Sequence, residues 1–140
     1  MICANTEEIT KLLANSKTIA LVGASENPSR ASNSIGKFLI NFGYKVFAVN
    51  PNLEEFQGEK CYNSLDEIQE KIDIVDVFRD PNFVLEISEA ATRIKAKSIW
   101  FQDGVINSEA AELALSSGLT VVQNRCIYRD ILNFGITLKK

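Results

Sequence analysis

Short apolar runs recur along the chain, and each one stops at polar or turn-forming residues. The first run, residues 18–22, has the sequence TIALV and stops at Gly23. Continuous apolar runs of this length, rich in β-branched residues, are typical of strands that are buried on both faces. The pattern predicts a sheet of about five strands. The four further runs cover residues 46–49, 74–78, 98–101 and 119–122.

The segments between these runs have apolar residues at the spacing of an amphipathic helix. Such spacing occurs before Gly43, in residues 84–94 and in residues 110–117. Strands that alternate with helices over short connections lie parallel, because each crossover helix returns the chain to the same edge of the sheet. We therefore predict an α/β fold, a single Rossmann-like domain over residues 1–140 with a doubly wound sheet of about five parallel strands and flanking helices.

A further amphipathic helix is predicted near the N-terminus, over about residues 6–15, and its first residues, TEEI, resemble a capped start. Its apolar residues, among them Ile9 and Leu13, would face the domain, so we expect residues 1–16 to pack on the outside. Between the second and third strands, Ser64 is expected to cap a short helix.

The composition is that of an ordinary globular protein, with 46% hydrophobic and 24% charged residues among 140. The net charge of -3 and the scattered Lys and Arg residues argue against a nucleic-acid partner, which normally requires a basic surplus. The three cysteines are too far apart for a disulfide framework or a zinc site, which fits a reducing compartment. No apolar stretch approaches the roughly 20 residues that span a bilayer. We expect a soluble, cytoplasmic protein with no membrane partner.

Histidine is absent from the sequence. Its absence excludes Ser-His-Asp and Cys-His catalytic pairs and every histidine-ligated metal site. Much hydrolase chemistry is excluded with them. The sequence therefore favours a binding function over an enzymatic one, and we predict neither catalytic residues nor a metal site.

The candidate site lies at the edge of the sheet where the strands end. In a parallel sheet this edge gathers strand C-termini, helix N-termini and unpaired backbone N–H groups, which suit a phosphate-bearing ligand. Arginines, among them Arg30 and Arg79, and several small polar residues converge there. The loops at this edge cover residues 23–30, 50–52, 78–81, 102–105 and 124–126.

The first of these loops has one glycine, Gly23, and is not a G-x-G-x-x-G dinucleotide fingerprint. We expect it to run to a helix that begins near Ser34. A loop of this length could wrap a phosphate, with Arg30 as a charged partner. The alternative is a solvated loop whose polar residues only cap the helix. The expected hydroxyl and amide donors are Ser25, Ser32, Asn33 and Ser34.

The end of the second strand distinguishes between nucleotide ligands. NAD-binding domains usually place Asp or Glu there to hold the ribose 2′-OH, whereas this chain has Asn50. A neutral amide better suits a ribose with an extra phosphate, as in coenzyme A or NADP. NADP would be expected to bring a nearby basic residue, but Glu54 and Glu55 follow instead.

Three further features leave alternatives open. Arg79 and Asp80 follow a strand and are either site residues or a local surface pair. Trp100 and Phe101 are expected in the core. Cys126 precedes the C-terminal segment, where it is either a buried, inert side chain or a reactive thiol at a helix start.

The strand ends together resemble a known family, the CoA-binding proteins, which are similar to the N-terminal CoA-binding domain of the succinyl-CoA synthetase α subunit. The resemblance covers about residues 18–126, most of the chain. The matching motifs are ALVGAS at 20–25, VNP at 49–51, DIVDVFR at 73–79, WFQDGV at 100–105 and NRC at 124–126.

The resemblance implies that coenzyme A is the cofactor. In the relatives, the loop after the first strand holds the CoA phosphates, the second and third strand ends flank the nucleotide, and the last two face the pantetheine arm. Transferred to this sequence, the resemblance implies cofactor-binding roles for Gly23, Ala24, Ser25, Arg30, Asn50, Pro51, Phe78, Arg79, Gln102, Gly104 and Asn124.

The synthetase comparison also limits the activity, because its phosphohistidine and nucleotide chemistry lie in additional domains. We therefore expect a non-enzymatic module that binds CoA or acyl-CoA as a carrier, sensor or regulator. The alternatives are an NAD(P)-binding, oxidoreductase-like domain and a partner-binding protein with a vestigial nucleotide site. A second copy of the chain or another protein is left open as a partner.

Overall fold

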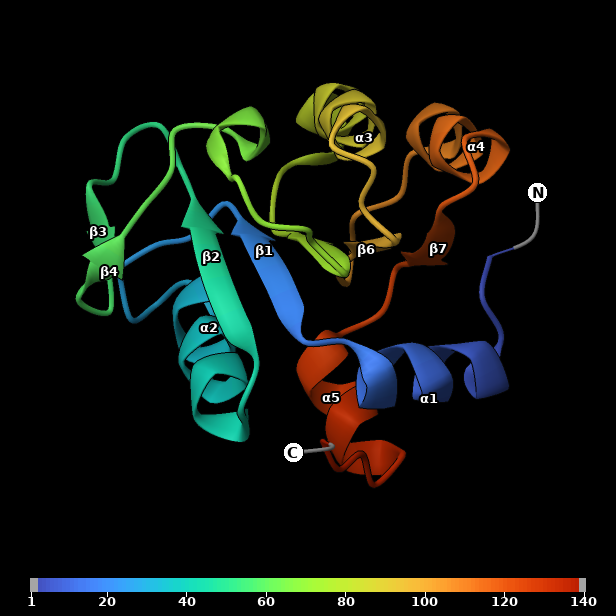
Figure 1. Cartoon of the computed structure of the whole chain (residues 1–140), viewed down its shortest axis with the longest axis horizontal. Helices are drawn as coiled ribbons and strands as arrows, with labels where there is room; N and C mark the ends of the chain where they lie inside the picture. Colours follow the sequence, from blue (N-terminus) through green and yellow to red (C-terminus); the bar gives the residue numbers. More distant parts are fainter. Residues whose placement is uncertain (1–2, 139–140) are drawn as a thin grey trace.

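The computed structural model describes residues 3–138, and its centre is a five-stranded parallel sheet (Figure 1). The strand order is β2-β1-β5-β6-β7, and every pair is parallel. The predicted fold class is thus confirmed. The strands are β1 (Thr18–Val22), β2 (Lys45–Val49), β5 (Ile74–Val77), β6 (Ser98–Phe101) and β7 (Thr120–Gln123).

Helices cover both faces of this sheet (Figure 1). One face packs against α1 (Thr6–Asn15), α2 (Ala31–Phe42) and α5 (Ile127–Asn133). The other face packs against α3 (Val84–Arg93) and α4 (Ser108–Ser116). The chain builds outward from β1 to β2 and then, from β5, in the opposite direction, so β1 and β5 flank the point at which the winding reverses.

The N-terminal helix lies on the outside of the domain, as predicted. Ile9 and Leu13 are its buried residues. Its cap is Asn5, one residue earlier than the predicted capped start, because the Asn5 side chain accepts the backbone N–H of Glu8 and the Glu8 side chain accepts that of Asn5. This reciprocal pair satisfies two otherwise unpaired donors. None of the helices within residues 3–138 has the length and apolar character needed to cross a membrane.

The strands read as continuous apolar runs because both faces of the sheet are covered. Trp100 and Phe101 are fully buried, which confirms their expected place in the core. Asp76 in β5 interrupts the apolar pattern: it is also fully buried, and neither of its carboxylate oxygens has a hydrogen-bond partner within residues 3–138. Burial raises the pKa of Asp76 well above its ordinary value.

The segment between β2 and β5 contains a hairpin that the sequence did not predict, formed by β3 (Glu55–Phe56) and β4 (Glu59–Lys60). Strands of two residues are too short to show an alternating pattern. The 3-10 helix η1 (Leu65–Glu67) does follow Ser64, but the Ser64 side chain makes no capping bond. A second 3-10 helix, η2 (Pro81–Phe83), precedes α3.

Candidate functional site

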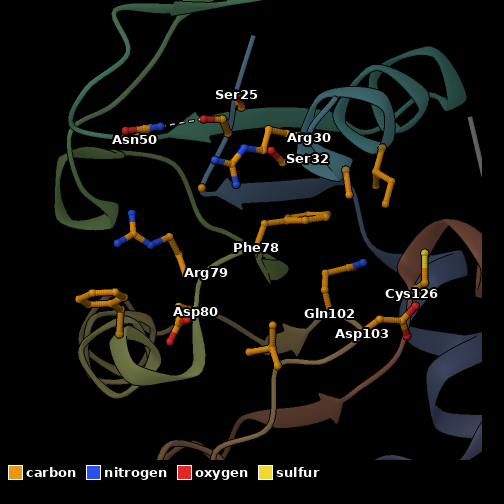
Figure 2. A pocket seen from close by; sticks show the side chains of 16 residues that line it. Ser25, Arg30, Ser32, Asn50, Phe78, Arg79, Asp80, Gln102, Asp103 and Cys126 are labelled. Carbon is orange, nitrogen blue, oxygen red and sulfur yellow. Dashed lines mark hydrogen bonds between the residues drawn. The ribbon is translucent and has the colours of Figure 1, made fainter. Parts of the chain in front are cut away.

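A cavity of about 630 Å³ opens at the carboxyl edge of the sheet, above the ends of β1, β5 and β6 (Figure 2). Eight of the eleven predicted site residues line it, so the structure brings together loops that are up to about eighty residues apart in the sequence. Those eight are Gly23, Ala24, Ser25, Arg30, Asn50, Phe78, Arg79 and Gln102.

Gly23 allows the ends of β1 and β5 to meet beneath this cavity. Its φ is +93°, and a Cβ at this position would lie 2.5 Å from the carbonyl oxygen of Phe78. Both the positive φ and the short distance to the Phe78 carbonyl favour glycine at this position. The lone glycine of the first loop therefore has a structural reason independent of any dinucleotide fingerprint.

The first loop is held from two sides by asparagine side chains. Asn50 Nδ2 donates to the carbonyl oxygen of Ala24 at 2.8 Å, marked by the dashed line in Figure 2. Asn33 Nδ2 donates to the carbonyl oxygen of Ser25 at 2.9 Å. The loop is also shorter than predicted, because α2 begins at Ala31 rather than near Ser34.

Among the donors predicted for this loop, the structure separates those that face the cavity from those already used. Ser25 and Ser32 line the cavity. Asn33 does not line it, since its amide binds Ser25, and the Ser34 hydroxyl donates to the carbonyl oxygen of Ala31 at 3.3 Å. Asn33 and Ser34 thus support the backbone rather than border the cavity.

Two arginines supply the positive charge of the cavity. Within residues 3–138, neither Arg30 nor Arg79 forms an ion pair, whereas the other three arginines each pair with an aspartate. Arg79 lies over the ring of Phe83 at 5.0 Å instead. The alternative of an Arg79–Asp80 surface pair is not observed, because Asp80 caps η2 by accepting the backbone N–H of Asn82 at 2.9 Å.

The opposite end of the cavity is formed by the β6 and β7 ends (Figure 2). Gln102 is 5% exposed, and its Oε1 accepts the backbone N–H of Ile127 at 3.2 Å. Asp103 binds Arg129 through both carboxylate oxygens. Cys126 is half-buried and also lines the cavity, so it is neither fully buried nor remote from the site.

Two predicted site residues, Gly104 and Asn124, line neither this cavity nor the one next to it. They contact each other instead, since the backbone N–H of Gly104 donates to Asn124 Oδ1 at 2.8 Å. This bond joins the loops after β6 and β7. In the structure the two residues therefore connect the loops at the β6–β7 end of the site without lining either cavity.

A second cavity, of about 310 Å³, lies on the α3 face of the same edge. It contains Pro51, the remaining predicted site residue, and shares Gly23, Asn50, Arg79 and Phe83 with the larger cavity. Its walls combine apolar and polar side chains, and they include the ion pair of Asp66 with Arg93, which lowers the pKa of Asp66. The apolar wall residues are Val22, Val49, Leu65, Ile87 and Ala90.

Several lining residues were not predicted. Ile35, Phe83 and Val105 border the larger cavity but have no polar group to mark them in the sequence. Phe83 had one usable signal in the sequence, which is its position shortly after a strand end. In the structure its large apolar ring is 51% exposed.

This fold and site define a class: a Rossmann-like domain whose cavities open at the point where the winding of the sheet reverses. Within that class, the chain belongs to the CoA-binding domain family, whose sequence model matches residues 17–131. It is related to the CoA-binding domains of ADP-forming acetate–CoA ligases. The family predicted from the strand-end motifs is thereby confirmed.

The chain is similar both to proteins of about its own length and to a part of a much longer ligase. The uncharacterized protein YneT of Bacillus subtilis is 38% identical over 120 residues, which cover 86% of this chain and 89% of YneT. A hypothetical protein from Pyrococcus horikoshii has a solved structure that matches with a TM-score of 0.90 and 42% identity, over 93% of this chain and 92% of that one. The ADP-forming acetate–CoA ligase of Archaeoglobus fulgidus is 32% identical over 121 residues, which cover 79% of this chain but only 18% of the ligase.

Proposed function

We propose that this protein binds coenzyme A or acyl-CoA without catalysing a reaction, as a carrier, sensor or regulatory module. The observation that supports this most directly is the pair of arginines, Arg30 and Arg79, at one cavity of a CoA-binding-family domain without an ion pair to any described carboxylate. An unpaired guanidinium forms strong, charge-assisted hydrogen bonds to phosphate oxygens.

The residues along the carboxyl edge of the sheet support one orientation of the bound ligand. The end with Arg30 and Arg79 lies at the first loop and β5 and suits the phosphates, and the apolar side chains of the neighbouring smaller cavity suit an adenine ring. The other end offers Gln102 and Cys126, whose side chains suit the amides and thiol of a pantetheine arm. CoA would then span the edge from the β2 end to the β6 and β7 ends.

The oxidoreductase-like alternative has less support. Both polar atoms of the Asn50 side chain are already in use, because Nδ2 donates to Ala24 and Oδ1 accepts the backbone N–H of Asn52 at 2.9 Å. A ribose 2′-OH would meet no carboxylate there. A vestigial site is the remaining alternative, and it predicts that none of these nucleotides binds.

Isothermal titration calorimetry with CoA, dephospho-CoA and NAD tests the proposal. We expect CoA to bind more tightly than NAD, and the substitutions Arg30→Gln and Arg79→Gln to weaken CoA binding roughly tenfold or more each, the value of a charge-assisted hydrogen bond. An arginine that contacts the 3′-phosphate should lose less affinity for dephospho-CoA than for CoA. Lys45→Gln is the charge-matched control, since Lys45 is paired with Glu70 and lines neither cavity.

Two outcomes would contradict the proposal. Tighter binding of NAD than of CoA would favour the oxidoreductase-like alternative, and the absence of binding by all three nucleotides would favour the vestigial site. Equal affinities for the arginine variants and the Lys45→Gln control would remove the two arginines from the phosphate site.

A further inference from the structure

Two asparagine side chains hold two consecutive carbonyl groups of the first loop. Asn50, at the end of β2, binds the carbonyl oxygen of Ala24, and Asn33, in the first turn of α2, binds that of Ser25. Asn33 is only 2% exposed, so its amide is fixed by the surrounding core as well as by this bond. The two asparagines come from different elements and approach the same short stretch of backbone.

Because peptide groups are planar, these two hydrogen bonds also fix the directions of the Ser25 and Glu26 N–H groups. No peptide bond among the described residues is cis, and in a trans peptide the C=O of one residue and the N–H of the next point in opposite directions. With the Ala24 carbonyl turned to Asn50, the Ser25 N–H points away from Asn50. With the Ser25 carbonyl turned to Asn33, the Glu26 N–H points away from Asn33.

Neither of these two N–H groups is used by the protein. The backbone N–H groups of Ser25 and Glu26 donate to no acceptor within residues 3–138. The Ser25 hydroxyl oxygen accepts the backbone N–H of Asn27 at 3.0 Å, which leaves its own hydrogen available as a third donor. Consecutive free backbone N–H groups are donors that the oxygens of one phosphate group can accept.

We propose that Asn33 and Asn50 are positioning residues, which orient the Ser25 and Glu26 N–H groups toward a phosphate group of the ligand and do not themselves contact it. This inference rests on the proposed function, because it names the loop atoms that would hold the phosphates of CoA. An amide is required at both positions, since a carboxylate has no hydrogen to donate to a carbonyl oxygen and would add a negative charge beside the phosphate.

The loop also keeps its own carboxylate in place. Gln57, at the tip of the β3–β4 hairpin, donates from Nε2 to Glu26 Oε1 at 2.9 Å. This contact gives the hairpin a role at the site, because it holds the only carboxylate between Gly23 and Arg30 in a defined place. The Glu26 backbone N–H remains free while its side chain is bound.

The test compares neutral substitutions, so that no charge is added at the site. We expect Asn33→Ala and Asn50→Ala each to weaken CoA binding about tenfold, the size of one oriented hydrogen bond to a charged group. Ser34→Ala is the matched control, because Ser34 lies on the same helix and its hydroxyl binds only the Ala31 carbonyl. Thermal unfolding of each variant is measured alongside the titrations.

Amide NMR spectra add a readout that a merely structural role would not change. When CoA or inorganic pyrophosphate is added to the wild-type protein, the amide protons of Ser25 and Glu26 should shift downfield as they donate to phosphate, and the shift should shrink in both asparagine variants. This readout is obtained from the wild-type protein even if a variant fails to fold.

The outcomes separate this inference from the proposed function. If CoA binds the wild-type protein but the Ser25 and Glu26 amides do not shift, the positioning role is overturned and CoA binding stands. Unchanged CoA affinity in the Asn33→Ala and Asn50→Ala variants overturns it as well. If the wild-type protein binds no CoA, both the proposed function and this inference are wrong.

Discussion

The buried carboxyl of Asp76 makes stability depend on pH in a direction that can be measured. Asp76 lies in the central strand of the sheet, opposite Leu21 on one side and Trp100 on the other. It is fully buried, and its carboxylate oxygens have no hydrogen-bond partner in the described part of the chain. Burial raises its pKa well above 3.8, the ordinary value, because the charged form would lose its hydration without gaining a partner. The informative substitution is Asp76→Asn, which keeps the shape and removes the ionisation.

The direction in which stability changes with pH follows from proton binding by Asp76. Between 3.8 and the raised pKa, the folded protein holds a proton on Asp76 that the unfolded chain has released. Stability from this group is therefore fully present below the unfolded pKa and is lost as the pH rises toward the folded pKa. The loss is about 1.4 kcal/mol for each pH unit within that window.

The assay is urea unfolding of the wild-type protein and the Asp76→Asn variant at pH 5, 6 and 7. Histidine, the side chain that usually titrates in this range, is absent from the sequence, so no imidazole contributes to the pH dependence of the free energy of unfolding. We expect the wild-type protein to lose about 1.4 kcal/mol per pH unit relative to the variant until the folded pKa is passed. Asp66→Asn is the control: Arg93 lowers the pKa of Asp66, so both its titrations lie below this range and its effect should be constant. Parallel profiles for the wild-type protein and the Asp76→Asn variant would refute the reasoning.

Two more predictions concern the backbone and the thiols. Gly23→Ala should lower the free energy of unfolding by roughly 1–3 kcal/mol from its backbone conformation alone, with more from the contact at Phe78; a change within about 0.5 kcal/mol in urea unfolding would contradict this. A small alkylating reagent should modify Cys126 before Cys61, since Cys61 is 5% exposed and burial raises its pKa. CoA should slow the modification of Cys126, as followed by peptide mass mapping, and faster labelling of Cys61 would count against the assignment.

The fold was predictable because its signals are local and repeated. Each strand of the sheet is buried on both faces, so it appears in the sequence as an apolar run with a clear end, as at Val22 or Phe101. The hairpin of β3 and β4 was not predictable, because its strands have two residues each and Phe56 owes its burial to a contact with α2 near Gly36. A contact of that kind depends on tertiary packing, which no local pattern records.

The site was predictable to the level of its loops but not of its side-chain roles. A strand end places a residue at the carboxyl edge, and this rule located Ser25, Arg79 and Gln102 at the cavity. It could not show that the amides of Asn33 and Asn50 already bind backbone carbonyls, because hydrogen-bond partners depend on distances across the fold. Asn33 and Asn50 therefore both support the loop in the structure, and Asn50 also lines the larger cavity as the sequence suggested, whereas Asn33 does not.

The pairing of charges distinguishes the two arginines at the larger cavity from the other arginines of the chain. The net charge of -3 argues against partners that are held by long-range attraction, such as nucleic acids. Over short distances the pairing pattern matters more, since screening limits an exposed charge to about 8 Å at physiological salt. Arg93, Arg125 and Arg129 are neutralised by aspartates, whereas Arg30 and Arg79 keep their charge for whatever enters the larger cavity. This pairing pattern supports the proposed binding of a small, multiply charged anion at this edge, where Asp103 is already paired with Arg129 and Asp80 caps η2.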